Sequence, residues 1–174
     1  MEQMTSNLFT TLEEARNWML KNKQVGAICP CCSQLVKVYK RKLNASMAVE
    51  LISLYKLNKR APDAFFHHKK FIDNWTRGGD FAKLLYWDLI QEQPKDPEQD
   101  KRTSGTYRIT QRGIAFVERL IVIPTHCYVC TGQPLGFSEE QGDIVACLDS
   151  KFSYSELMAP GINVIQSKSH PIFG

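Results

Sequence analysis

The sequence predicts an α+β protein in which a mainly helical segment is inserted between two short strand regions that carry cysteine pairs. Two observations lead to this prediction. Cys29 and Cys32, and again Cys127 and Cys130, lie beside runs of β-branched and aromatic residues that are typical of strands. Between the two pairs, apolar residues recur at helical spacing. The chain has 174 residues, 43% of them hydrophobic, which is enough for one compact core or two small ones.

Charge and hydropathy exclude several classes of protein. The 22 basic and 18 acidic residues leave a net charge of +4, which is too small to indicate a nucleic-acid partner by itself. The longest apolar run, 144–148, is far shorter than the roughly 20 residues that a membrane-spanning helix needs. The N-terminus lacks the apolar block of a secretory signal. We therefore expect a cytoplasmic protein whose six cysteines serve as metal ligands or free thiols rather than disulfides.

The cysteine spacing predicts a metal site. A Cys-x-x-Cys pair around a tight turn, here called a knuckle, can direct both thiolates at one tetrahedral ion. Two such pairs make one structural zinc site with the predicted ligands Cys29, Cys32, Cys127 and Cys130. Whether Cys31 or Cys32 is the ligand stays open, although the match to the second pair favours Cys32. A redox pair and unrelated buried thiols are the alternatives. We expect Cys31 and Cys147 to act as small hydrophobic residues.

Helix caps and apolar periodicity predict the remaining elements. Thr10 or Thr11 with Glu13 or Glu14 forms a capping box that starts an N-terminal helix. Asn44 caps a second helix and Thr110 a later one. The predicted strands cover 25–28, 34–39, the basic stretch 37–42, 106–110 and 121–123, and the predicted helices cover 44–58, 64–74, 81–92, 111–120 and a short segment at 153–158.

The segment Tyr107–Phe116 resembles a known arrangement. It is similar to the strand-to-helix segment that follows the wing in many bacterial winged-helix proteins, where Thr110 would cap the helix and Gly113 follows three residues later. The resemblance covers 44–120 and implies DNA binding through the third helix and the wing. With the cysteine pairs, the whole chain resembles uncharacterised bacterial and phage proteins that combine a zinc ribbon with a winged helix.

The expected fold is thus a winged helix-turn-helix inserted between the two knuckles of a zinc ribbon, with a flanking N-terminal helix and a C-terminal extension. The expected domains are 1–43 (N-terminal helix and first knuckle), 44–120 (winged-helix-like insert), 121–136 (second knuckle) and 137–174 (acidic C-terminal extension).

The charge is unevenly distributed along the chain. Residues 37–60 contain seven basic residues and one acidic residue, whereas 133–174 contain two basic and five acidic residues. A basic segment can neutralise phosphates, although lysines on a solvated strand edge also serve to prevent aggregation. The predicted DNA-contacting residues are Lys40, Arg41, Lys42, Lys83, Lys101 and Arg102. The predicted third helix offers few base-reading side chains, because most of it is apolar.

The resulting hypothesis is a zinc-containing, DNA-binding regulatory or accessory protein of bacterial or phage origin, and not an enzyme. One alternative is a protein-binding adaptor or inhibitor, for example a phage protein that acts on a host complex, with the same scaffold used for docking. A second alternative is a nuclease with a histidine-bound metal, because His67 and His68 lie between the cysteine pairs. The oligomeric state stays open, with a homodimer as one option.

Overall fold

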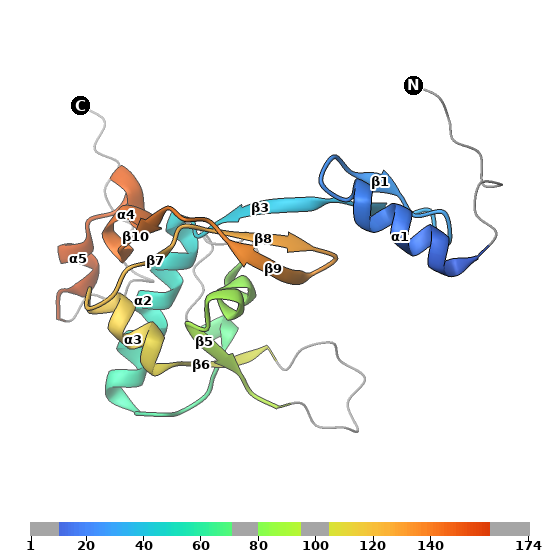
Figure 1. Cartoon of the computed structure of the whole chain (residues 1–174). Coiled ribbons are helices and arrows are strands. Elements are labelled where there is room, and N and C mark those ends of the chain that lie inside the picture. Colours follow the sequence, from blue (N-terminus) through green and yellow to red (C-terminus); the bar gives the residue numbers. More distant parts are fainter. Residues whose placement is uncertain (1–10, 71–79, 95–104, 161–174) are drawn as a thin grey trace, which may run out of the picture. The chain divides into compact units, whose positions relative to one another are not determined.

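The protein is a mixed α+β molecule, described here from a computed structural model in which residues 11–70, 80–94 and 105–160 are placed. The chain divides into two compact units (Figure 1). Unit 1 consists of the segment up to Arg41 together with His126–Ser138. Unit 2 consists of Lys42–Thr125 together with the segment from Glu139 onward. The C-terminal residues 139–160, expected as a separate extension, therefore group with the helical unit.

Unit 1 combines one helix with two small antiparallel arrangements of strands. Helix α1 (Leu12–Asn22) precedes a two-stranded hairpin of β1 (Ala27–Ile28) and β2 (Leu35–Val36). A three-stranded sheet follows in the order β3-β8-β9, formed by β3 (Val38–Lys42), β8 (His126–Cys130) and β9 (Gln133–Phe137). β3 is therefore an outer strand of this sheet, and β8 is the inner one.

Unit 2 contains most of the helices. Its elements are α2 (Ala45–Arg60), β4 (Phe66–His67), η1 (His68–Lys70), η2 (Phe81–Trp87), β5 (Ile90–Glu92), β6 (Thr106–Ile109), α3 (Gln111–Val117), β7 (Ile123–Pro124), β10 (Gln141–Gly142), α4 (Ile144–Leu148), η3 (Asp149–Lys151) and α5 (Tyr154–Met158), where η marks a 3₁₀-helix. Three strands form a sheet in the order β4-β6-β5, and β7 pairs with β10. No helix within the described residues is long and apolar enough to cross a membrane.

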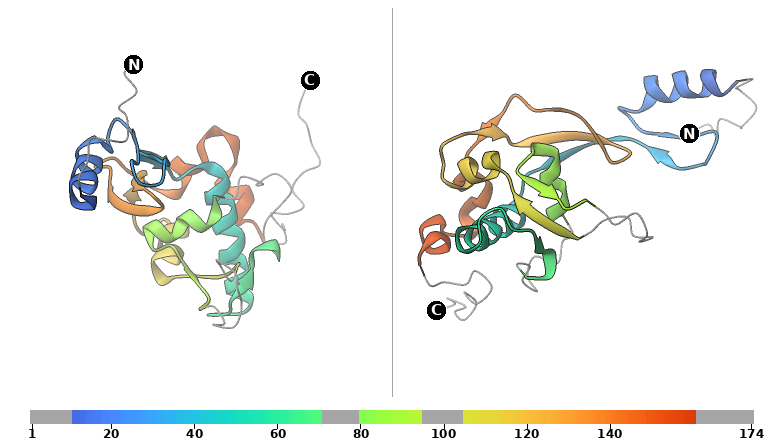
Figure 2. Two further views of the ribbon diagram at one scale, coloured as in Figure 1. Left: turned by 90° about the vertical axis from the view of Figure 1, so that its right-hand side faces the viewer. Right: turned by 90° about the horizontal axis from the view of Figure 1, so that it is seen from below.

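Helix α2 lies at the centre of unit 2. It contacts α3, α4, α5, β6 and η2, and the views in Figures 1 and 2 show these elements grouped around it. Most of its side chains from Ala45 to Tyr55 are buried. A helix that is apolar on nearly all sides has to be surrounded by other elements, because one exposed face would leave apolar surface in water. The core of unit 2 is therefore built around this helix.

Four of the helix starts that the sequence predicts are confirmed. The Thr11 hydroxyl accepts a hydrogen bond from the Glu14 N–H while the Glu14 carboxylate accepts one from the Thr11 N–H, which completes a capping box. The side chains of Asn44 and Thr110 cap α2 and α3, and Ser153 caps the short helix α5. These caps are local interactions between residues three apart, and the sequence pattern is sufficient to locate them.

Two predicted helices are wrong. The region predicted as a helix over 64–74 instead contains β4 and η1, with 71–79 outside the described residues. Phe66 pairs with Tyr107 and His67 with Thr106, so strand pairing with β6 replaces the helix. The helix predicted over 81–92 ends at Trp87, because Asp88 adopts a left-handed backbone conformation with φ 55°. The chain then continues as β5, which also pairs with β6.

Gly113 is held in a confined position at the start of α3. A Cβ atom at this position would collide with the Leu89 carbonyl oxygen and would lie 2.7 Å from Cγ1 of Ile109. The close approach joins α3 to the residues that lead into β5. Gly113 is thus required for packing, although glycine is otherwise a poor helix former.

We predict that Gly113→Ala destabilises the protein by about 2 kcal/mol, the usual range for overpacking, although alanine in a helix normally adds about 1 kcal/mol of stability. The measurement is chemical denaturation followed by circular dichroism. Ala115→Gly, in the same helix, is the matched control and is expected to cost about 1 kcal/mol by lost helix propensity. A Gly113→Ala variant as stable as the parent would contradict the described packing.

Candidate functional site

The first cysteine cluster lies at the turn between β1 and β2. The Cys29 N–H donates to the Gln34 carbonyl at 2.8 Å, and the Ser33 N–H donates to the Cys29 carbonyl at 2.8 Å. Ser33 has φ 58°, a left-handed conformation that lets the chain reverse within a few residues. This is the tight turn around a Cys-x-x-Cys pair that the sequence predicts.

Within this turn, backbone N–H groups are directed at the first sulfur. Hydrogen bonds from the backbone N–H groups of Cys31 and Cys32, together with the Cys32 side chain, lower the pKa of the Cys29 thiol. Desolvation, followed by the negative charge at Cys29, raises the pKa of the Cys31 thiol. N–H groups that stabilise a thiolate are a feature of thiolate metal ligands, because they offset the charge on sulfur. The Cys29–Cys32 turn therefore fits one half of a zinc site.

The second cysteine pair has a different local structure from the predicted knuckle. Cys127 and Cys130 are both buried on β8, and Cys127 lies opposite Phe137 of β9. The chain turns only after the pair, at Thr131 (φ 50°) and Gly132 (φ 80°), where two positive φ angles are typical of a tight hairpin. Because β8 pairs with β9, the segment from Cys127 to Cys130 is extended, whereas the segment in a knuckle would form a turn. Burial raises the pKa of the Cys127 thiol.

The four predicted zinc ligands all belong to unit 1, but the structure does not assemble them. Among the described residues, which include all six cysteines, no group of three or more histidine, cysteine, aspartate or glutamate side chains is arranged to hold a metal. The first pair lies at the β1–β2 turn, whereas the second pair lies on the strand β8. Cys147 lies apart on α4 of unit 2, where burial, followed by the negative charge of Asp143, raises its pKa to about 11.

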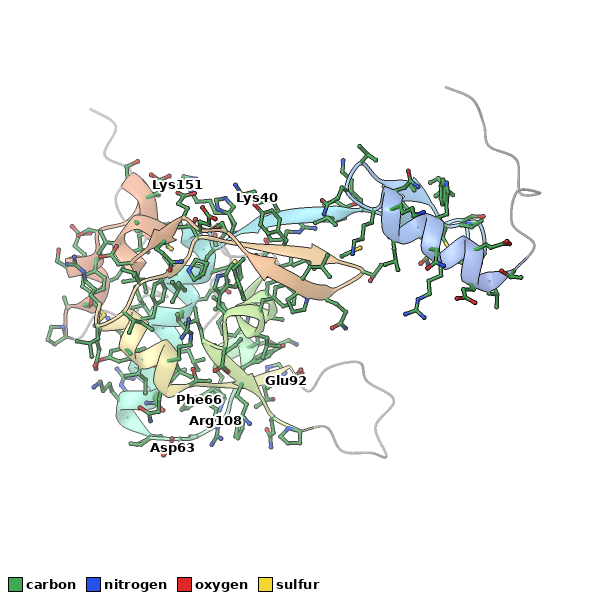
Figure 3. All side chains as sticks on the ribbon, viewed as in Figure 1. Lys40, Asp63, Phe66, Glu92, Arg108 and Lys151 are labelled. Atoms are coloured by element: carbon green, nitrogen blue, oxygen red, sulfur yellow. The ribbon has the colours of Figure 1, made fainter. Side chains whose placement is uncertain are left out.

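The basic strand predicted from the sequence is present as β3. Lys40, Arg41 and Lys42 are all exposed on it, and Figure 3 shows the Lys40 side chain projecting from the strand. The Arg41 guanidinium carbon lies 5.0 Å from the centre of the Tyr39 ring, a cation–π contact. Among the described residues, none of these three cations lies within 4.0 Å of a carboxylate.

Several basic side chains of unit 2 have local partners. Lys59 lies 3.1 Å from the Glu118 carboxylate, and Arg119 lies 3.1 Å from that of Asp143. Lys83 forms an ion pair with Asp80. Arg108 on β6, labelled in Figure 3, donates to the Gln91 side-chain oxygen at 2.7 Å. Within the described part of the chain, Lys40, Arg41 and Lys42 differ from these side chains because they are consecutive on one strand and none is in an ion pair.

The expected recognition helix is unsuited to reading bases. It is a 3₁₀-helix of seven residues, η2, with Phe81, Leu84 and Trp87 buried. Lys83, the predicted contact on this helix, is engaged by Asp80. Lys101 and Arg102, the predicted contacts in the wing, lie outside the described residues. Of the six predicted DNA contacts, the structure brings together Lys40, Arg41 and Lys42.

The two histidines considered for a nuclease centre have different environments. His67 is exposed on β4, whereas the His68 ring stacks on Phe81 with their centres 4.9 Å apart. The His68 Nε2 lies 3.7 Å from a carboxylate oxygen of Glu50, whose side chain is only 3% exposed. Sequence analysis does not predict this contact, because a glutamate on a helix usually faces solvent. No third metal-ligating side chain joins them among the described residues.

Two exposed aromatic side chains were missed by the sequence reasoning. Tyr39 on β3 is 41% exposed, and Phe137 on β9 is 44% exposed. Both belong to the sheet that carries the basic strand. The available signal was the position of Tyr39 between Lys37 and Lys40, since an aromatic residue within a basic strand is a common feature of nucleic-acid-binding surfaces.

The thiols are expected to differ in reactivity in metal-free protein. The thiolate is the reactive form, so the lowered pKa of Cys29 should make this residue alkylate at lower pH than Cys127 or Cys147. With a pKa of about 11, roughly one Cys147 thiol in ten thousand is ionised at pH 7. Iodoacetamide labelling between pH 6 and about 9, mapped by mass spectrometry, tests this order. Labelling of Cys147 before Cys29 in folded protein would contradict it.

No protein-family model matches this chain, and neither a curated protein nor a solved structure matches it. The residues and geometry of the chain itself are therefore the basis for a function. Two features stand out: a cysteine turn with the shape of half a zinc site, and an exposed strand whose cations have no carboxylate partner among the described residues.

Proposed function

We propose that this chain is a zinc-containing, DNA-binding protein with a regulatory or accessory role in a bacterium or a phage. The observation that carries the proposal is the basic strand β3. Lys40, Arg41 and Lys42 are exposed in succession, and no carboxylate among the described residues neutralises them. Cations of this kind bind phosphates and release the counterions around DNA, which supplies affinity independent of sequence.

The surroundings of β3 in the sequence support this proposal. Neither 23–49 nor 126–138 contains an aspartate or a glutamate. These segments include both hairpin strands and all three strands of the β3-β8-β9 sheet. Segments without carboxylates contribute a more positive surface potential than segments of mixed charge. On a surface that also carried carboxylates, the same cations would bind a polyanion with lower affinity.

The order of elements in unit 2 supports the winged-helix interpretation. After α2, the chain forms β4, η2, β5 and β6 in turn and then enters α3. β5 and β6 pair on either side of the 95–104 connection, as expected of strands that flank a wing, and β4 adds to the same sheet. Because η2 is a short 3₁₀-helix whose Phe81, Leu84 and Trp87 are buried, we propose that this unit serves as a scaffold and that the main phosphate contacts lie on β3.

The zinc proposal rests on the cysteine spacing and on the β1–β2 turn. The turn directs two backbone N–H groups at the Cys29 sulfur, as a thiolate ligand requires. Unit 1 also buries few apolar side chains within the described residues: Ala15, Met19, Ala27, Cys127, Val129 and Cys130. Small units with so limited a core are commonly stabilised by a metal or by disulfides. A structural zinc bound by Cys29, Cys32, Cys127 and Cys130 would supply that stability.

Removal of zinc is expected to destabilise unit 1. Elemental analysis of protein purified without chelator should find one zinc per chain, and chelation should lower the melting temperature by several degrees, because metal-binding energy becomes folding energy. Cys29→Ser should reproduce the effect, whereas Cys147→Ser, on α4 of unit 2, should retain the zinc. Zinc-free protein with an unchanged melting temperature in chelator would contradict the proposal.

Replacement of Lys40, Arg41 and Lys42 by alanine is expected to abolish most DNA binding. Fluorescence anisotropy with a random-sequence duplex should show binding by the parent that weakens as salt rises. Each lost phosphate contact should make the slope of log K against log salt shallower by about 0.9.

The matched control removes the same charge elsewhere, by replacing the exposed residues Arg60, Lys70 and Lys151 with alanine. If affinity depends on net charge alone, the two triple variants will lose it equally, and the assignment to β3 will be wrong. Absence of binding at low salt in the parent would instead favour the protein-docking alternative for the same scaffold.

A further inference from the structure

The basic strand carries a flat, exposed stack in addition to its charge. Tyr39 and Arg41 are two residues apart on β3, so their side chains leave the same face of the strand. Their 5.0 Å contact confirms this alignment. Tyr39 as a whole residue is 41% exposed. Aromatic rings and arginine guanidinium planes are the two surfaces on which proteins stack unpaired bases.

Cations flank this stack along the outer strand of the sheet. Lys40 and Lys42 leave β3 on the opposite face from Tyr39 and Arg41, because side chains alternate along a strand. β3 is an outer strand in the order β3-β8-β9, so a ligand that follows its edge can contact side chains of both faces. Phe137 on β9 of the same sheet is 44% exposed. A basic track with interleaved aromatic rings is the usual surface for single strands.

The same surface offers little to a duplex beyond phosphate contacts. In a duplex the bases are stacked on one another, so an exposed ring gains no base to stack on. A duplex is read by side chains that enter a groove, usually from a helix. The helix that the winged-helix resemblance assigns to this role, η2, is a 3₁₀-helix of seven residues with Phe81, Leu84 and Trp87 buried, and its Lys83 is paired with Asp80. The stack formed by Tyr39 and Arg41 therefore has a use only with unpaired bases.

We propose that β3 binds single-stranded nucleic acid, with the phosphates on Lys40 and Lys42 and a base stacked on Tyr39 beside Arg41. This proposal rests on the DNA-binding function proposed above and narrows its ligand. The ligand is a polynucleotide strand with accessible base faces, as either DNA or RNA. The proposal differs from a purely electrostatic site. Such a site would bind a duplex more tightly than a single strand, because a duplex carries more charge per unit length.

The test compares three labelled probes of about 12 nucleotides, a length within the usual range for a single-strand site. They are oligothymidylate, oligouridylate and a duplex of the same length, each titrated against the full chain at one fixed salt concentration. At least one single strand should bind more tightly than the duplex. Tyr39→Ser should weaken that binding about tenfold and leave the duplex affinity unchanged, whereas Tyr39→Phe, which keeps the ring, should bind like the parent.

The matched control is Leu135→Ser, which removes an exposed apolar side chain from β9 without removing a ring, and which should leave all affinities unchanged. A measurement on the parent chain covers the case of a poorly folded variant: an oligonucleotide with 5-bromouracil should cross-link to Tyr39 under ultraviolet light, as mapped by mass spectrometry. Tighter binding of the duplex, an unaffected Tyr39→Ser variant or cross-links confined to other residues would overturn the single-strand proposal and leave DNA binding intact. Failure of all three probes to bind at low salt would overturn both proposals.

Discussion

Burial of α2 is the constraint on which unit 2 depends. A helix with apolar residues on nearly every side cannot remain in contact with water, and each neighbouring element covers part of its surface. The short helices α3, α4 and α5 are too short to be stable alone, so their packing on α2 provides most of their stability. Specific polar contacts then fix their positions. The Tyr55 hydroxyl on α2 donates to Glu118 after α3, and Lys56 donates to the Ala159 carbonyl after α5.

Unit 1, in contrast to unit 2, has only a small apolar core among the described residues. It contains few buried apolar side chains among the described residues, and two of these are Cys127 and Cys130. A thiol buried in such a small core acts as a hydrophobic residue when protonated, and as a ligand it has to become a thiolate. In the proposed zinc site, these cysteines would exchange apolar packing for metal coordination. Cys127 and Cys130 would therefore have to take part in the strand pairing of β8 and also coordinate the proposed zinc.

The elements that sequence analysis located are those set by local contacts. Thr11, Asn44 and Thr110 cap helices whose start depends on residues three positions away, so the pattern was sufficient. β4 and β5 were missed because both exist through pairing with β6, which lies far along the chain. The position of Cys127 and Cys130 on β8 has the same origin, since hairpin pairing with β9 extends the segment. At the candidate site, the basic residues were visible in the sequence. Their lack of carboxylate partners within the described part of the chain was not, because ion pairing depends on the fold.

The outer position of β3 has a consequence for self-association. An outer strand presents backbone N–H and C=O groups that another strand can pair with, and such edges are the usual starting points for aggregation. Consecutive cations on this edge keep copies of the chain apart by electrostatic repulsion. A bound polyanion would neutralise the same cations and, with them, the repulsion. The same cations on β3 therefore serve two purposes. They bind the proposed ligand, and they prevent another strand from pairing with this edge.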